Sequence, residues 1–306
     1  MLDYHVHLWP HAERADAAEQ RLERLAAYCE TAASRGVGEI ALTEHLFRFT
    51  AVRGLVGDFW AGEPDRALRE QIAGYFAHHA TADFDVYVEA VLAAKAAGLP
   101  VKLGLEVDYY PGQMDRVAEF LAGYPFDVLL GSVHWLGTWM FDNLEDEVAT
   151  GEWERRGTEG AWRSYTDSLV ELAESAAVDV LAHPDLVKLT GRFPPPSLRA
   201  ECEARMAEAA ASSGLAVEIS SAGLRKPVGE AYPSASLLAQ FARRQVPITT
   251  ASDTHGVANL AEHAAELGAL ASAAGYSSLR AFSSRVGSDV PLATSWSPPG
   301  SALLSR

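Results

Sequence analysis

The sequence predicts an α/β barrel with a parallel sheet, because short apolar runs alternate with amphipathic stretches along the chain. The chain has 306 residues, a normal length for a barrel, and 48% of them are hydrophobic, which permits a sizeable core. About seven strand-helix repeats favour closure into a barrel over an open sheet. The runs that we expect to form strands are residues 2–7, 39–43, 101–107, 126–133, 178–182, 215–219 and 246–251.

Helical patterns occupy the intervals between these runs. Gly36, Gly98 and Gly214 each follow such a pattern, and a left-handed glycine commonly ends a helix. Ser197 follows a run of prolines and is expected to cap the start of its helix. The expected helices are residues 13–34, 84–97, 113–122, 159–176, 197–212, 233–243 and 258–274.

Two long segments interrupt this alternation. Residues 47–83 are rich in glycine and aromatic residues, and residues 135–156 are acidic and aromatic. Both follow candidate ligands closely, so we predict that they form lids or substrate walls, with surface decoration as the alternative. The expected organisation is one barrel over residues 1–292 with these two insertions, followed by a C-terminal tail over residues 293–306.

Composition and charge exclude several classes of function. The formal net charge is -16, which argues against general affinity for nucleic acid or anionic membrane surfaces. Cys29 and Cys202 lie in helical patterns and are expected to be small buried side chains, without a disulfide. The first residues do not resemble a signal peptide, and no apolar run is long enough to span a bilayer. We therefore expect a cytoplasmic protein; the sequence does not indicate its oligomeric state.

Most of the ten histidines lie at or just after the ends of the expected strands. In a parallel barrel the C-terminal ends of the strands meet on one face, so these side chains should converge. Imidazole and carboxylate are ligands that zinc, manganese and iron accept. We therefore predict one site for several metal ions, built from His5, His7, His11, Glu44, His45, Glu106, His134, His183, Asp253 and His255.

Residue spacing supports this prediction. His5 and His7 stand two positions apart, so they share one face of a strand and can bind one ion. Glu106 ends an apolar run, and a buried carboxylate needs a cation. Lys102, four positions earlier, is the alternative to a metal as that cation. Asp253 follows the last strong strand in Ser-Asp-Thr-His-Gly, the most specific single motif in the chain.

Taken in order, the motifs His-x-His, Glu-His, Gly-x-Glu-Val-Asp-Tyr, Ser-Val-His, Ala-His-x-Asp-Leu and Ser-Asp-x-His-Gly resemble the PHP (polymerase and histidinol phosphatase) superfamily. Four segments narrow the resemblance to its monofunctional histidinol-phosphate phosphatases, and the likeness runs from residue 1 to about residue 292. These segments are residues 104–109, 129–137, 221–227 and 230–233.

The resemblance implies a distorted (β/α)7 TIM-like barrel of the PHP type that holds about two to three divalent ions, whether zinc, manganese or iron. Glu44 is expected to orient a ligand by hydrogen bonding. His11 departs from the family pattern, because only Leu8-Trp9-Pro10 separate it from His7. The implied ligands are His5, His7, Glu106 and Asp253 for the first ion, Glu106, His134 and His183 for the second, and His11, His45 and His255 for the third.

The resemblance also implies a phosphatase of histidine biosynthesis that converts L-histidinol phosphate to L-histidinol and phosphate. The expected reaction is in-line attack of a metal-bridging hydroxide, with a metal-bound water, Asp253 or His255 as the proton donor to the leaving alkoxide. The cations expected to bind phosphate are Arg225, Lys188, Arg192 and Lys226, of which Arg225 matches the family pattern best. For Arg192 and Lys226 the alternative is a solvated charge in a loop.

The substrate's cationic amine and imidazole suggest a role for the acidic insertion, where Asp142, Glu145 and Asp146 are candidate contacts. Three alternatives remain from the sequence. The chain could act on another phosphorylated small molecule, such as a sugar or nucleotide phosphate, or be a non-catalytic metal-binding PHP module. A metal-dependent amidohydrolase also begins with His-x-His, but would normally carry a bridging lysine where this chain has Glu106.

Overall fold

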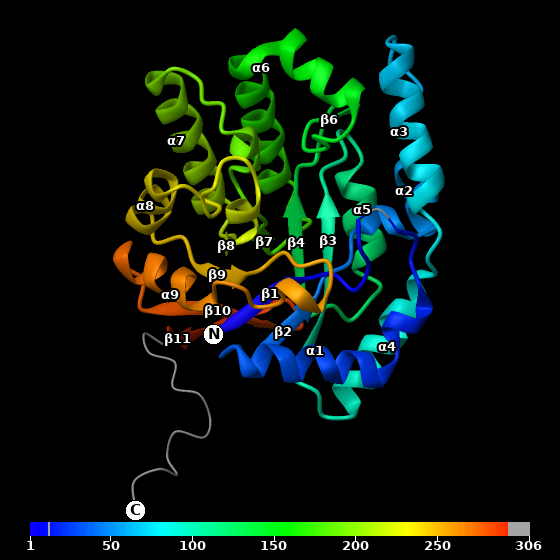
Figure 1. Ribbon diagram of the computed structural model, residues 1–306, viewed down its shortest axis with the longest axis vertical. Coiled ribbons are helices and arrows are strands. Elements are labelled where there is room, and N and C mark those ends of the chain that lie inside the picture. Colours follow the sequence, from blue (N-terminus) through cyan, green and yellow to red (C-terminus); the bar gives the residue numbers. More distant parts are fainter. Residues whose placement is uncertain (12, 293–306) are drawn as a thin grey trace, which may run out of the picture.

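The computed structural model describes residues 1–11 and 13–292, and within them seven parallel strands form one sheet surrounded by helices (Figure 1). Neighbouring strands pair in the order β1-β2-β3-β4-β7-β8-β9, so the predicted α/β barrel is confirmed. Every expected run contributes a strand. The strands are β1 (Leu2–Val6), β2 (Glu39–Leu42), β3 (Val101–Asp108), β4 (Val128–Ser132), β7 (Val180–Leu181), β8 (Ala216–Ser220) and β9 (Ile248–Ala251).

The first and last strands of the sheet meet and nearly close the barrel. Val6 forms a parallel bridge with Thr254, and the amide of His7 donates to the carbonyl oxygen of Thr254 at 2.8 Å. Below this point, the Asp3 carboxylate accepts hydrogen bonds from the amide and hydroxyl of Ser252 at 2.8 and 2.6 Å. The short strand β7 makes the barrel irregular on the opposite side.

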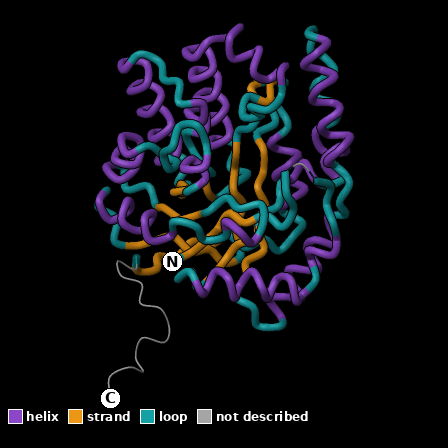
Figure 2. Tube along the Cα trace, viewed as in Figure 1, coloured by secondary structure: helices purple, strands orange, loops and turns teal. Residues whose placement is uncertain are grey.

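Helices cover the outside of the sheet, as the purple segments around the orange strands show (Figure 2). In α5, buried Met114, Val117 and Leu121 recur at helical spacing, so one face of the helix packs on the barrel. Each such buried side chain contributes about 1.5–3 kcal/mol. The outer helices are α1 (Leu22–Ser34), α4 (Phe84–Ala96), α5 (Met114–Leu121), α6 (Glu147–Glu174), α7 (Pro196–Ser212), α8 (Ala235–Arg243) and α9 (Ala264–Ala273).

Several helix starts differ from the prediction. The first helix begins at Leu22, after a separate 3-10 turn (Ala17–Gln20) whose N-cap is Asp16. The expected helix 159–176 matches the second part of α6, which follows a kink where Gly157 has non-helical dihedral angles. The first part of α6 was not predicted; it begins at Glu147, where the Asp146 side chain accepts hydrogen bonds from the amides of Val148 and Ala149.

Of the other local predictions, some are wrong and some are confirmed. Ser197 is not a cap, because the helix already begins at Pro196, for which the fixed φ of proline is suited. Gly36, Gly98 and Gly214 do adopt positive φ angles of 82°, 87° and 67°. The final expected helix begins at Ala264 instead of residue 258, after a 3-10 turn (Val257–Asn259).

The two insertions lie on the face of the barrel where the strands end. The first contains α2 (Ala51–Val56) and α3 (Arg66–His79), and the second begins with a hairpin of β5 (Trp135–Leu136) and β6 (Trp139–Met140). Two polar contacts join them. The Thr138 hydroxyl donates to Glu63 at 2.5 Å, and the Gln71 amide donates to Asp146.

A C-terminal hairpin, which the helix and strand patterns did not predict as a whole, follows α9. Its strands are β10 (Ser278–Ser283) and β11 (Val286–Pro291), paired antiparallel beside β9. The predicted tail lies outside the described residues. None of the described helices is long and apolar enough to cross a membrane.

Candidate metal centre

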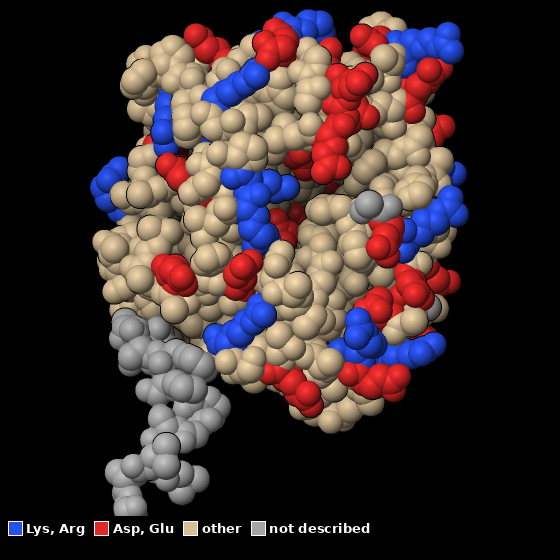
Figure 3. All heavy atoms as spheres, viewed as in Figure 1, with Lys and Arg blue, Asp and Glu red and all other residues tan. Residues whose placement is uncertain are grey.

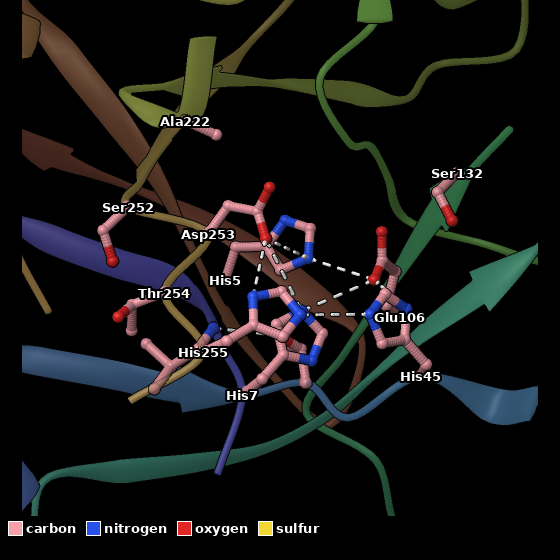
Figure 4. A network of polar contacts seen from close by, with 12 residues as sticks. His5, His7, His45, Glu106, Ser132, Ala222, Ser252, Asp253, Thr254 and His255 are labelled. Atoms are coloured by element: carbon pink, nitrogen blue, oxygen red, sulfur yellow. Dashed lines mark hydrogen bonds and ion pairs between the residues drawn. The ribbon is translucent and has the colours of Figure 1, made fainter. Parts of the chain in front are cut away.

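The predicted ligands converge at the C-terminal ends of the strands, around the carboxylate of Glu106 on β3 (Figure 4). Glu106 Oε2 lies 3.3 Å from His5 Nε2, 3.5 Å from His7 Nε2 and 2.5 Å from His45 Nδ1. Its other oxygen, Oε1, lies 3.5 Å from His134 Nε2 and 3.1 Å from His183 Nε2. Imidazoles from different strands thus face both oxygens of one carboxylate.

Asp253 and His255 complete the centre from the loop after β9. Asp253 Oδ1 lies 3.8 Å from His5 Nε2, 3.7 Å from His7 Nε2 and 3.8 Å from His255 Nδ1. His255 Nε2 in turn lies 3.3 Å from His45 Nε2. Figure 4 shows the second oxygen of Asp253 directed away from these imidazoles.

His11 reaches the same group despite its short spacing from His7. Its ring centroid lies 3.5 Å from that of His255 and 5.5 Å from that of His45. His11 is exposed, whereas His5 and His7 are fully buried. The turn after β1 therefore brings His11 to the outer edge of the cluster.

The backbone is strained at two of these positions. Asp253 and His183 adopt positive φ angles of 50° and 28°, which cost a non-glycine residue of the order of 1–3 kcal/mol. Arg225 Nη2 stabilises the Asp253 turn by donating to the carbonyl oxygens of Ser252 and Asp253 at 2.7 and 3.0 Å. The amide of His183 donates to Glu218 Oε1 at 3.2 Å. Such strain is common where side chains are held for binding.

The charges of the centre call for cations. Burial alone would raise the pKa of Glu106, but His45, His5 and His134 hold it well below its usual range. Burial lowers the pKa of His45 to about 3, and an imidazole that gives up its added proton offers a lone pair. In the described part of the chain, several buried polar atoms here lack a hydrogen-bond partner: His5 Nε2, His7 Nδ1 and Nε2, His45 Nδ1 and Glu106 Oε2.

Donor atoms of three overlapping groups lie within 4.8 Å of one another. Neutral imidazoles and carboxylates are the donors that zinc, manganese and iron accept, so the unmatched atoms fit divalent ions. The groups are His7 with His45 and His255, His5 with His7 and Glu106, and His45 with Glu106 and His134.

Further buried acids orient the ligands. Glu44, which the sequence indicated, accepts from the amides of Leu8 and Trp9 and has Oε2 3.6 Å from His7 Nδ1. Two further acids were not predicted: Glu218, whose Oε2 lies 2.8 Å from His5 Nδ1, and Asp108, whose Oδ1 lies 2.6 Å from His134 Nδ1. The signal for Asp108 was available, because it stands two positions after Glu106 on the same face of β3.

The cations predicted to bind phosphate have different surroundings. Arg225 lies against the Asp253 turn and keeps 26% of its side chain exposed. Lys188 is buried, and its Nζ contacts Asp185 Oδ2 at 3.2 Å, Glu230 Oε2 at 3.1 Å and the Ala231 carbonyl oxygen at 2.8 Å.

Arg192 and Lys226 lie further out. Arg192 pairs with Glu154 at 2.7 Å, beside a pocket of about 510 Å³ that Trp153 and Pro227 also line. Lys226 is exposed at the end of the turn that carries Arg225. Lys102, the alternative partner of Glu106, instead pairs with Glu39 at 3.4 Å.

The centre opens to solvent through its less buried members. Asp253, His255 and His134 expose 19%, 14% and 13% of their side chains. Figure 3 shows a hollow near the middle of the viewed face, with basic side chains on one side and acidic side chains on the other. A small polar molecule could approach Asp253, His255 and His134 without displacing the buried ligands.

Comparison with known proteins connects this geometry to one family. The model of the PHP domain matches residues 3–222. A protein of Deinococcus radiodurans described as a probable histidinol-phosphatase is 33% identical over 228 residues, which cover 74% of this chain and 78% of the relative.

Solved structures share the fold. A histidinol phosphate phosphatase from Lactococcus lactis, in complex with zinc, L-histidinol and phosphate, superimposes with a TM-score of 0.65 and 22% identity over 94% of this chain and 98% of that one. A candidate histidinol phosphatase from Listeria monocytogenes gives a TM-score of 0.68 and 20% identity over 86% of this chain and 98% of that one. The chain thus has the same barrel fold as these phosphatases.

Proposed function

The chain belongs to the PHP domain family, and we propose that it is a histidinol-phosphatase, a hydrolase that converts L-histidinol phosphate to L-histidinol and phosphate in histidine biosynthesis. The observation that carries this proposal is Glu106, whose two oxygens face imidazoles from opposite sides of the barrel mouth. A carboxylate flanked in this way is suited to bridge two cations. The relatives described above support the substrate, and a cytoplasmic location is part of the same proposal.

The proposed ligand sets follow the arrangement of the donors. Divalent ions bound here would lower the pKa of a water molecule and neutralise the charge of the phosphate. The proposed sets are His5, His7, Glu106 and Asp253 for one ion, Glu106, His134 and His183 for a second, and His11, His45 and His255 for a third.

The remaining chemistry falls to polar side chains at the mouth. A water oxygen attacks phosphorus opposite the leaving oxygen, the ester P–O bond breaks, and the alkoxide takes a proton to give L-histidinol and inorganic phosphate. We assign the proton transfer to Asp253, because Oδ1 faces His5, His7 and His255 while Oδ2 points away from them. His255 would hold Asp253 in place, and the guanidinium of Arg225 suits the phosphate.

The test combines metal analysis with phosphate release. Protein purified without chelators should contain about two to three ions per chain and release phosphate from histidinol phosphate faster than from sugar or nucleotide phosphates. Asp253→Asn should abolish release while the fold is retained, whereas Asp115→Asn, on the exposed side of α5, should behave as wild type. Protein without metal would refute the centre; faster turnover of another phosphoester would refute the substrate.

A further inference from the structure

Asp142 lies in the loop after β6, which leads back towards the metal centre. The hairpin starts directly after His134, and its register pairs Trp135 with Met140. The chain that leaves β6 therefore runs back beside the strand end that carries His134, and Asp142 is the second residue after that strand. Its side chain is only partly exposed.

The charge of Asp142 acts on side chains of several elements beside the barrel mouth. Burial raises the pKa of Tyr75 on α3, and Asp142 is the next cause of that shift. After burial and closer groups, the same charge acts on the pKa of His134, of Tyr165 on α6 and of Tyr232 after β8. These residues belong to separate elements beside the mouth, in keeping with the position that the hairpin register gives Asp142.

The carboxylate of Asp142 is free to bind a ligand. It forms no ion pair and no side-chain hydrogen bond with any residue that the structure describes. Asp146, in the same loop, is occupied as the N-cap of α6, and Glu145 is exposed. The buried Nε1 of Trp135, in the hairpin itself, also lacks a partner among the described residues.

An unpaired carboxylate at this position repels a phosphate dianion, and a chain of net charge -16 offers no general attraction to offset that repulsion. The arrangement becomes favourable when the substrate carries a cation close to its phosphoester. We propose that Asp142 binds the ammonium group of the substrate, so that the enzyme selects phosphomonoesters with an amine beside the ester carbon. This inference rests on the proposed function and identifies a residue that recognises the substrate of the enzyme.

The experiment compares two substrates and three proteins. The substrates are L-histidinol phosphate and 3-(imidazol-4-yl)propyl phosphate, which lacks only the amine. Wild type should prefer the amine by about 10- to 100-fold in kcat/KM, as expected for a charged hydrogen bond. Asp142→Asn should lose most of this preference through slower turnover of L-histidinol phosphate, with the other substrate unchanged or faster. Glu145→Gln, which removes the same charge from the same loop, should retain the preference.

Each other outcome overturns the inference. An equal loss of kcat/KM on both substrates in Asp142→Asn would assign Asp142 a purely structural role. Equal turnover of both substrates by wild type would show that the enzyme does not select for the amine. If Asp142→Asn does not fold, Asp142→Ser replaces it, with thermal unfolding as the check. Absence of histidinol phosphate turnover by metal-loaded wild type would reject the proposed function as well, whereas turnover without discrimination rejects only this inference.

Discussion

Replacing Glu218 with glutamine should weaken metal binding while leaving the barrel folded. Glu218 Oε2 lies 2.8 Å from His5 Nδ1, and Oε1 accepts the amide of His183 at 3.2 Å. Because a carboxylate only accepts, it keeps a proton of His5 on Nδ1, so Nε2, which faces Glu106, is the nitrogen through which His5 would bind a metal. Glutamine keeps the size and one acceptor, but it turns an N–H donor toward His5 Nδ1.

The imidazole of His5 must then take the other tautomer, with its proton on Nε2. That proton occupies the position through which His5 would bind a metal. Loss of a partner that orients a ligating histidine typically costs about 10- to 100-fold in metal affinity. At about 1.4 kcal/mol for each tenfold change, the expected loss is about 1.4–2.8 kcal/mol.

Competition between the protein and a chromophoric zinc chelator would measure this loss. The matched control is Glu203→Gln, since Glu203 is a buried glutamate of α7 that pairs with Arg199 at 2.8 Å. The control should keep the zinc affinity of wild type, and thermal unfolding should show that both variants are folded. A zinc Kd for Glu218→Gln within about twofold of wild type would show that Glu218 does not set the His5 tautomer.

Three further predictions concern stability. Gly223→Ala should lower the free energy of unfolding by about 1–3 kcal/mol in a denaturant titration, because its Cβ would lie 2.0 Å from the Glu230 carbonyl oxygen. Lys188→Met should cost about 3–5 kcal/mol in the same assay, because it leaves the buried Asp185 carboxylate without its cation. Burial lowers the pKa of His79 to about 4. Below pH ~6.5, His79 therefore binds a proton in the unfolded chain but not in the folded protein. The Tm advantage of wild type over His79→Gln should therefore shrink as the pH falls from 7.5 to 5.

Controls for these variants lie elsewhere in the chain. Gly74 is an exposed glycine inside α3 with open space at its Cβ position, so Gly74→Ala should stabilise by about 0.5–1 kcal/mol. Lys226→Met removes an exposed ammonium and should leave stability within about 0.5 kcal/mol of wild type. An unchanged stability of Gly223→Ala or Lys188→Met, or a pH-independent difference for His79→Gln, would contradict the corresponding prediction.

The strands and the group of converging histidines were predictable because they depend on local patterns. An apolar run followed by His or Glu marks the end of a buried parallel strand, and all such ends meet on one face of a barrel. The same logic did not identify Glu218, since a single carboxylate within an apolar strand does not indicate which neighbour it contacts. Its role depends on the register between strands that are far apart in the sequence.

Tertiary contacts also decide what the sequence left open. Lys188 was expected to bind phosphate because it follows His183, but its ammonium contacts Asp185, Glu230 and a carbonyl oxygen, so a contact with phosphate stays a prediction. The first part of α6, before the kink at Gly157, begins at the cap of Asp146, a signal that the glycines within the helix obscured. The β10–β11 hairpin depends on pairing that a weak local pattern does not reveal.

The junction between β1 and β9 determines when this protein can acquire metal. Asp3 and Ser252, which hydrogen bond across it, are 249 positions apart in the sequence, and the donors His5 and Asp253 lie on its two sides. Contacts of such long range form late in folding, because the entropy of closing the chain is lost before they can stabilise it. On the ribosome, a nascent chain would therefore hold only part of the ligand set until the last strand emerges. Full-affinity metal loading would then occur only in completed molecules, and each bound ion would in turn stabilise the two ends of the barrel against separation.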